Sequence, residues 1–207
     1  MSDLAINAIE DSKKFFTTKQ GKYNSSSHQL EDAINTLDTK ITDYLTNITH
    51  VDVGVNDIDE SIINLQVVKN LERIGDIVMN LNEFYDGVYE EKEDFTESAM
   101  EEVCEMYDIV IDMIKNSINY FETRNDMYLG FIIEQENKLD AISDKAKKEH
   151  FIRMRSNECV HPIASSTYVD VVSNLEGMGD HAYNIIKLIS PHVPKHTTQE
   201  VTIEMLK

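Results

Sequence analysis

The chain has 207 residues and a net charge of −19, with 38 Asp and Glu against 19 Lys and Arg. This length gives room for one extended domain or for two small repeats that share a core. So acidic a surface repels nucleic-acid phosphates and anionic lipid headgroups, which excludes nucleic-acid binding and favours cations or basic protein faces as partners.

The remaining composition indicates a helical protein of a reducing compartment. All three prolines lie at Pro162 or later, so the long preceding segment has no proline break, which is typical of an all-helical chain. Cys104 and Cys159 form no C-x-x-C motif and no metal-ligand spacing. The N-terminus lacks the features of a signal peptide, and no run of about 18 apolar residues occurs. We therefore expect a cytoplasmic location.

The first half of the chain predicts three helices, over about residues 4–18, 28–48 and 55–84. The serine cluster at residues 25–27 is expected to form a turn and to supply N-caps for the second helix. Asp57, followed three residues later by Glu60, is the expected cap of the third. An acidic, irregular segment over residues 87–94 is expected to separate the two halves.

The second half predicts three more helices, over about residues 95–124, 127–156 and 162–189. Pro162 suits the first turn of the last helix, and Pro191 and Pro194 should close it. Because the connections are short, we expect an all-α fold of two tandem three-helix bundles. The expected repeats cover residues 1–90 and 91–190, followed by an irregular tail at 191–207.

A duplicated motif is the strongest signal in the sequence. Leu71-Glu72-Arg73-Ile74-Gly75-Asp76 returns as Leu175-Glu176-Gly177-Met178-Gly179-Asp180, with the Glu and the Asp each displaced by 104 residues. Such self-similarity indicates two copies of one helical unit. The glycines inside these helices each cost roughly 1 kcal/mol relative to Ala, so a close approach by another helix or by a ligand is expected beside them.

Helical geometry places both acidic pairs within reach of solvent. In the last helix, Tyr168, Val171, Leu175, Met178, Ala182, Ile185, Ile186 and Ile189 form one apolar stripe. Relative to Leu175, Glu176 lies at about 100° and Asp180 at about 140°, which is the shoulder of the helix. Two carboxylates one turn apart repel each other unless a hard cation lies between them. A solvated acidic face, with Arg73 paired to Asp76, is the alternative interpretation.

These residues resemble the paired signatures of the PhoU family, written roughly L-E-R-I-G-D-H-A-x-N-I. The resemblance covers nearly the whole chain and implies a PhoU-like six-helix duplication that regulates phosphate uptake. It also implies iron or zinc bound on the bundle surface, with Glu72, Asp76, Glu176 and Asp180 as candidate ligands. The sequence departs from the pattern at Ile77, where the family has His, and at Gly177, where it has Arg. Asp38 and Asp140 could complete the metal shells from the second helix of each repeat.

The resemblance leaves two contexts open, because PhoU-like domains occur as freestanding regulators of phosphate ABC transporters and as cytoplasmic tails of sodium/phosphate cotransporters. The short first helix favours the cotransporter tail, which would lie at the inner face of the cell membrane. The expected partner is a membrane phosphate transporter, either separate or part of the same protein, and a homodimer is left open. Lys and Arg are scattered along the chain, so no site for phosphate itself is predicted.

Two other function classes remain. A metal-free structural bundle that docks on a membrane protein is the first. The second is a di-iron oxidoreductase, suggested only by the single E-x-x-H spacing of Glu158 and His161. No nucleophile elbow, glycine-rich phosphate loop or catalytic triad is visible, so no enzymatic activity is predicted.

Overall fold

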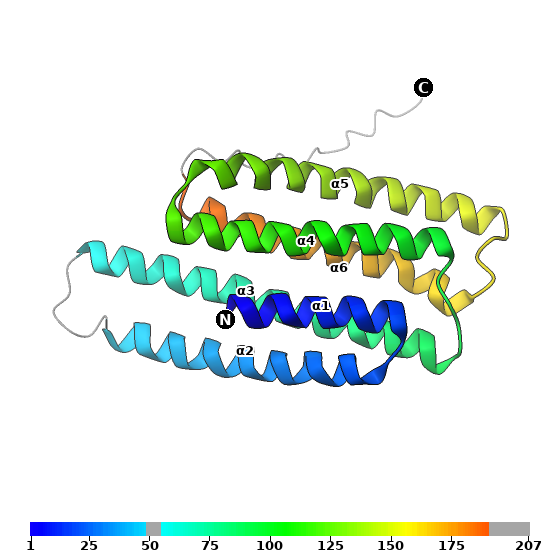
Figure 1. Cartoon of the computed structure of the whole chain (residues 1–207), viewed down its shortest axis with the longest axis horizontal. Helices are drawn as coiled ribbons and strands as arrows, with labels where there is room; N and C mark the ends of the chain where they lie inside the picture. The colour runs from blue at the N-terminus through cyan, green and yellow to red at the C-terminus, as the bar shows by residue number, and fades with distance from the viewer. Residues whose placement is uncertain (49–54, 191–207) are drawn as a thin grey trace, which may run out of the picture.

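The computed structural model describes residues 1–48 and 55–190, and these form six α-helices joined by short connections. Figure 1 shows them as two layers of long, nearly parallel rods. The helices are α1 (Ser2–Thr18), α2 (Gly21–Ile48), α3 (Val55–Glu90), α4 (Glu97–Thr123), α5 (Asp126–Arg155) and α6 (Pro162–Lys187). The all-α prediction of two tandem three-helix bundles is confirmed. The division at residues 90 and 91 stays a prediction, and the predicted tail at 191–207 lies outside the described residues.

The two bundles share one core. Within each bundle every helix packs on the other two, and the bundles meet where α3 contacts α6 and α1 contacts α4. The helices α2 and α5 are therefore the outermost elements, as Figure 1 shows. One continuous set of buried apolar side chains runs through both repeats. This arrangement brings the two motif-bearing helices, α3 and α6, side by side.

The predicted apolar stripe of α6 is confirmed, because all its members except Ile189 are buried. The corresponding stripe of α3 is also buried. Its members are Val67, Leu71, Ile74, Val78 and Leu81. Burying such side chains supplies most of the favourable free energy of folding, at about 25 cal/mol per Å² of apolar surface.

A buried hydrogen-bond network joins the repeats across α1, α3 and α4. The Ser12 hydroxyl donates to Asn82 Oδ1 at 2.7 Å and lies 2.8 Å from the Tyr107 hydroxyl. Tyr107 lies in turn 2.9 Å from the Tyr85 hydroxyl. Both tyrosines are fully buried, and burial raises the pKa of each phenol. A buried hydroxyl without a hydrogen-bond partner lowers the stability of the fold. The network therefore fixes the position of one bundle relative to the other.

The serine cluster does not form the predicted turn. The second helix already begins at Gly21, and the chain reverses at Lys19, whose φ of 56° is left-handed. The hydroxyls of Ser25 and Ser27 donate to the carbonyls of Gly21 and Tyr23, one turn earlier in the same helix. Back-bonding of this kind lets serines sit inside a helix, and it outweighed their preference for caps.

The third helix is longer than predicted at its C-terminal end. It begins at Val55, so Asp57 lies within its first turn and the predicted Asp57 cap is wrong. It continues to Glu90, through the first half of the segment predicted to be irregular. Val88 packs into the core there, and Gly87 faces open space. Tertiary burial of this last turn compensates for the poor helix propensity of the glycine.

The second repeat begins with well-formed caps. Thr96 accepts a hydrogen bond from the Ala99 N–H at the start of α4. Pro162 occupies the first turn of α6, as predicted. The Glu93 carboxylate, from the connection between the repeats, accepts the N–H groups of Ile163 and Ala164 at 2.8 and 2.9 Å. A carboxylate at a helix N-terminus is favoured by the helix dipole, so this contact anchors the connection to α6.

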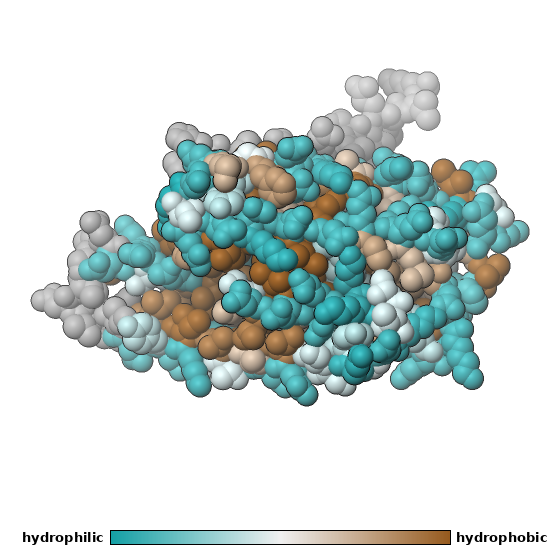
Figure 2. Space-filling model, in the orientation of Figure 1, coloured by the Kyte–Doolittle hydropathy of each residue, from teal (hydrophilic) through white to brown (hydrophobic). Residues whose placement is uncertain are grey.

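The surface is mostly hydrophilic on the face seen in Figure 2, with a hydrophobic area beside the start of α1. The first helix has 17 residues against 27 in α4, so it covers less of its bundle than α4 does. None of the helices, as far as the chain is described, combines the length and apolar character needed to cross a lipid bilayer.

We predict that Tyr107→Phe lowers the free energy of unfolding by about 1–3 kcal/mol, because it leaves the buried Tyr85 hydroxyl without its partner. Urea unfolding followed by circular dichroism measures this change. Tyr120→Phe on the same helix is the control, since the Tyr120 hydroxyl has no hydrogen bond to the described part of the chain. An equal loss in both variants would show that the network does not stabilise the fold.

Candidate functional site

The motif of the first repeat places its carboxylates on the outer shoulder of α3. Leu71 and Ile74 point into the core, Glu72 is partly exposed and Asp76 is exposed. The second motif repeats this arrangement on α6, where Glu176 is partly buried and Asp180 is exposed. The expectation that both pairs can be reached from solvent is therefore confirmed.

The first acidic notch consists of Glu72 and Asp76 on α3 with Asp38 on α2. Burial raises the pKa of Glu72, and the neighbouring charges of Asp76 and Asp38 raise it further, while Lys69 lowers it. Lys69 donates to Asp38 at 2.7 Å. The first notch thus contains its own cation, which offsets part of the repulsion among its carboxylates.

The second acidic notch consists of Glu176 and Asp180 on α6 with Glu136 and Asp140 on α5. Burial raises the pKa of Glu176, and Asp180 and Asp140 act in the same direction. Lys147 partly opposes this rise. Lys187 likewise opposes the rise in the pKa of Glu136. The second notch thus brings together four carboxyl groups, one more than the first.

Glu136 is the most perturbed acid of the site. Its side chain is only 2% exposed, and burial raises its pKa from 4.5 to about 8, with Asp180 and Asp140 as further causes. Because its pKa lies near 8, Glu136 is mainly protonated at neutral pH. The neighbouring carboxylates Asp180 and Asp140 favour this neutral form.

The two signatures also meet each other across the α3–α6 contact. His181 Nδ1 donates to Asn70 Oδ1 at 3.0 Å, and burial followed by the charge of Arg73 lowers the pKa of this histidine. The two departures from the family pattern are neighbours, because Ile77 Cδ1 lies 3.9 Å from the position that a Cβ would occupy at Gly177. An apolar residue and a glycine thus pack together where the pattern has a histidine and an arginine.

Comparison with protein families shows to which family this chain is related. The family model described as the PhoU domain matches residues 1–84 and 103–189, which include most of each of the six helices. The chain belongs to the PhoU domain family. No curated protein matches it in direct sequence comparison.

Solved PhoU structures have the same fold. PhoU from Pseudomonas aeruginosa superimposes with a TM-score of 0.81 at 20% identity, over 91% of this chain and 89% of that one. The phosphate transport system regulatory protein PhoU from Streptococcus pneumoniae gives 0.79 at 17% identity, over 90% and 86% of the two chains. The predicted family and its six-helix fold are both confirmed.

The four predicted metal ligands of this PhoU domain lie in two separate notches, each with acids of its own repeat. Asp38 and Asp140 do face the motif carboxylates, as expected, although Asp38 is held by Lys69. Within residues 1–48 and 55–190, no three His, Cys, Asp or Glu side chains converge closely enough to hold a metal as they stand. The metal assignment therefore stays a prediction that requires side-chain rotation. The E-x-x-H pair of Glu158 and His161 does not support a di-iron centre. Glu158 is exposed, and His161 lies at the start of α6.

The motif glycines have different environments. A Cβ at Gly179 would lie 2.3 Å from Leu139 Cδ2 and 3.4 Å from a Glu136 oxygen, so α5 requires a glycine there. At Gly75 the nearest contact would be an ordinary 3.4 Å to Ile34, and Gly177 is more open still. The predicted close approach is confirmed at Gly179, where it brings Glu136 beside the motif.

The sequence analysis did not identify Glu136 as a site residue, although a comparison of the two repeats indicates it. Leu37-Asp38 on the second helix corresponds to Leu139-Asp140 on the fifth. The same alignment pairs Glu136 with Ile34, a fully buried apolar residue. A carboxylate at a position that its sister repeat fills with isoleucine indicates a buried acid, which is a mark of functional sites.

We predict that Glu136→Gln makes the fold less sensitive to pH. Between about pH 4.5 and 8 the unfolded state loses the Glu136 proton while the folded state keeps it, so this group lowers stability as pH rises. The melting temperature of the variant should exceed that of the wild type increasingly over this range, by a few degrees, at roughly 2–4 °C per kcal/mol. Exposed Glu134→Gln, on the same helix, is the control. Parallel pH curves for wild type and Glu136→Gln would contradict the assignment.

Proposed function

We propose that this chain is a regulatory domain of phosphate uptake, not an enzyme, and that it docks on membrane transport machinery at the cytoplasmic face. The match to the PhoU domain family over both repeats carries this proposal. The structural likeness to a protein named as a phosphate transport system regulatory protein supports it further.

Of the two contexts, we favour a freestanding regulator of a phosphate ABC transporter over the tail of a sodium/phosphate cotransporter. The structural neighbour from Streptococcus pneumoniae is named as a regulatory protein of a phosphate transport system, which supports this preference. The cotransporter tail stays the alternative, and partner capture distinguishes the two.

We further propose that the acidic notches bind a cation and that the second notch binds it more tightly. The raised pKa of Glu136 indicates a place where negative charges crowd and a cation would relieve their repulsion. In the first notch Lys69 already supplies positive charge to Asp38. The second notch has four carboxyl groups against three in the first, which favours the notch of α5 and α6.

The donor set restricts the type of metal. All the acids of the second notch offer carboxylate oxygens, which suit hard cations. Zinc sites in proteins usually include sulfur or imidazole donors. His181 instead points toward α3, where its Nδ1 bonds Asn70. Of the two expected metals, iron therefore fits better than zinc.

Cation binding gives the domain a means of regulation. It would replace the Glu136 proton and reduce the negative charge on one face of the second repeat. Such a change alters the relative stability of docked and free states only to the extent that the partner contacts this face. The regulatory consequence is a shift in how the domain packs against the transporter.

We predict that Glu176→Gln with Asp180→Asn removes most cation binding, and that Glu72→Gln with Asp76→Asn removes less. Isothermal titration with Mn²⁺ as a hard probe cation, with proton release measured in weakly buffered solution, tests both variants. Wild type should release protons on binding because Glu136 ionises, and Glu136→Gln should not. Elemental analysis after purification without chelator identifies the native metal.

The control is Glu97→Gln with Glu101→Gln, an exposed pair four residues apart on α4. It removes the same charge from another helix face and should leave Mn²⁺ binding unchanged. If all three double variants bind equally, or if wild type binds no cation, the metal-free docking bundle becomes the better description. Unchanged helical content by circular dichroism ensures that the variants are folded.

We predict that a phosphate transporter is captured by crosslinking the full-length protein in its native cells. Loss of the gene should change the rate of radiolabelled phosphate uptake, and the second-notch double variant should restore it only in part. Recovery of an ABC transporter supports the freestanding regulator, and recovery of a covalently continuous cotransporter supports the alternative. Normal uptake in the deletion strain would contradict a role in phosphate transport.

A further inference from the structure

An open groove between α3 and α6 has a chemistry opposite to that of the rest of this acidic molecule. Its volume is ≈ 430 Å³. Three cations and three amides line it, together with two leucines, and no carboxylate is among the lining residues. The polar lining residues are Lys69, Arg73 and Lys187 with Gln66, Asn70 and Asn184. In a chain of net charge −19, such a concentration of positive groups requires an explanation.

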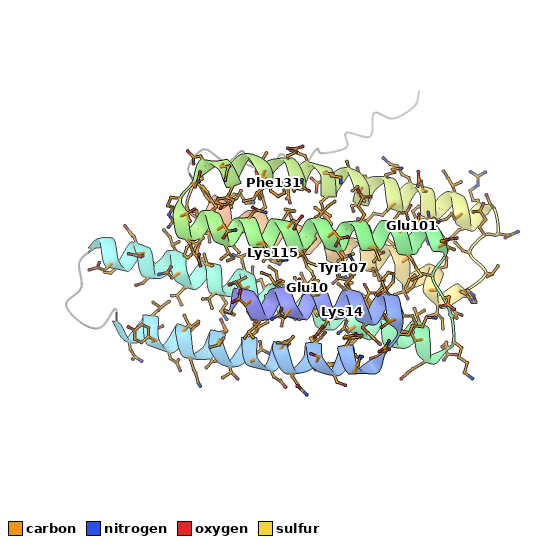
Figure 3. The ribbon with its side chains drawn as sticks, viewed as in Figure 1. Glu10, Lys14, Glu101, Tyr107, Lys115 and Phe131 are labelled. Carbon is orange, nitrogen blue, oxygen red and sulfur yellow. The ribbon has the colours of Figure 1, made fainter. Side chains whose placement is uncertain are left out.

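A second groove, between α1 and α4, also contains lysines, but each of them is paired with an acid. Its three lysines, Lys13, Lys14 and Lys115, each lie within 3.5 Å of an acid, namely Asp108, Asp11 and Glu10. Figure 3 shows Glu10 and Lys14 on α1 and Lys115 on α4, along the seam between the bundles. Those lysines are neutralised by their neighbours. In the α3–α6 groove, by contrast, only Lys69 of the three described cations forms an ion pair at 4 Å or less, with Asp38. Lys187 lies over the Tyr183 ring at 5.0 Å, and its charge acts on Glu136 from a greater distance.

The duplication provides an internal comparison. Positions equivalent to Lys69, Arg73 and Lys187, displaced by 104 residues, are Ser173, Gly177 and Glu83. The repeat-related face therefore has one acid and no cation at these positions. The equivalent helices of the other repeat pack without these cations, so packing alone does not require them. Their presence on one face only points to a ligand that this face binds.

The groups of the groove suit an anion with several oxygens. Arg73 and Lys69 lie one turn apart on α3, and Lys187 faces them from α6. A guanidinium presents a planar fork of N–H donors, and ammonium groups add strong charge-assisted hydrogen bonds. The side-chain amides of Gln66 and Asn184 add neutral donors at the rim. Asn70 contributes less, because it donates to the Gln66 carbonyl and accepts from His181.

We propose that this groove is a binding site for a phosphate group. The ligand is either inorganic phosphate or a small phosphate monoester, since both present the same tetrahedral oxyanion. The inference rests on the groove itself and does not depend on the proposed regulatory function. It goes beyond the sequence analysis, in which the scattered Lys and Arg predicted no phosphate site.

The test is isothermal titration of the full-length protein with inorganic phosphate and, separately, with glycerol 3-phosphate, at constant ionic strength maintained with NaCl. Wild type should bind saturably at millimolar concentration or below. Arg73→Gln with Lys187→Gln should weaken binding about tenfold or more, because it removes charge-assisted hydrogen bonds. Lys13→Gln with Lys115→Gln is the matched control, which changes net charge equally in the other groove and should bind as wild type does.

Asp38→Asn gives a test in the opposite direction. It releases Lys69 from its ion pair and removes a negative charge beside the groove, so it should tighten phosphate binding. Tighter binding of glycerol 3-phosphate than of inorganic phosphate would support the site and identify the monoester as the ligand. Absence of saturable binding by wild type, or an equal loss in the two double variants, would overturn the proposal. Metal-free protein is used throughout, so that this outcome is independent of cation binding at the notches.

Discussion

The packing of α3 against α6 is the constraint on which the rest of this molecule depends. It buries the apolar stripes of both signature helices in one core, so each helix can expose only its shoulders. The motif carboxylates therefore face outwards, toward α2 in the first repeat and toward α5 in the second. The same contact hydrogen-bonds His181 to Asn70 and creates the basic groove at its edge. Moving one helix against the other would alter all three features together.

The two repeats share a backbone plan but differ in electrostatics. The first notch contains Lys69, which compensates Asp38, whereas the second contains an additional acid, Glu136, that remains protonated at neutral pH. The glycine at 179 is part of this difference, because only a residue without a Cβ lets Leu139 and Glu136 approach so closely.

Charge of opposite sign lies on neighbouring parts of the same helix pair. Lys69 belongs to both regions, since it lines the basic groove and pairs with Asp38 of the first notch. An anion in the groove would compete with Asp38 for this ammonium, and release of Asp38 would increase the negative charge at the first notch. The structure therefore offers a direct physical route by which an oxyanion and a cation could influence each other's binding.

The sequence by itself determined the fold class, the helix pair that carries the motif and the solvent-facing position of its four acids. These follow from helical periodicity and an exact internal repeat, both of which are local properties of the chain. Helix ends were less certain, because the hydroxyls of Ser25 and Ser27 bond within α2 and burial of Val88 extends α3. Only the tertiary structure decided which acids share a notch, that Glu136 retains a proton, and that Arg73 and Lys187 line one groove. Those outcomes depend on burial and on distances between helices far apart in the chain, which no local pattern encodes.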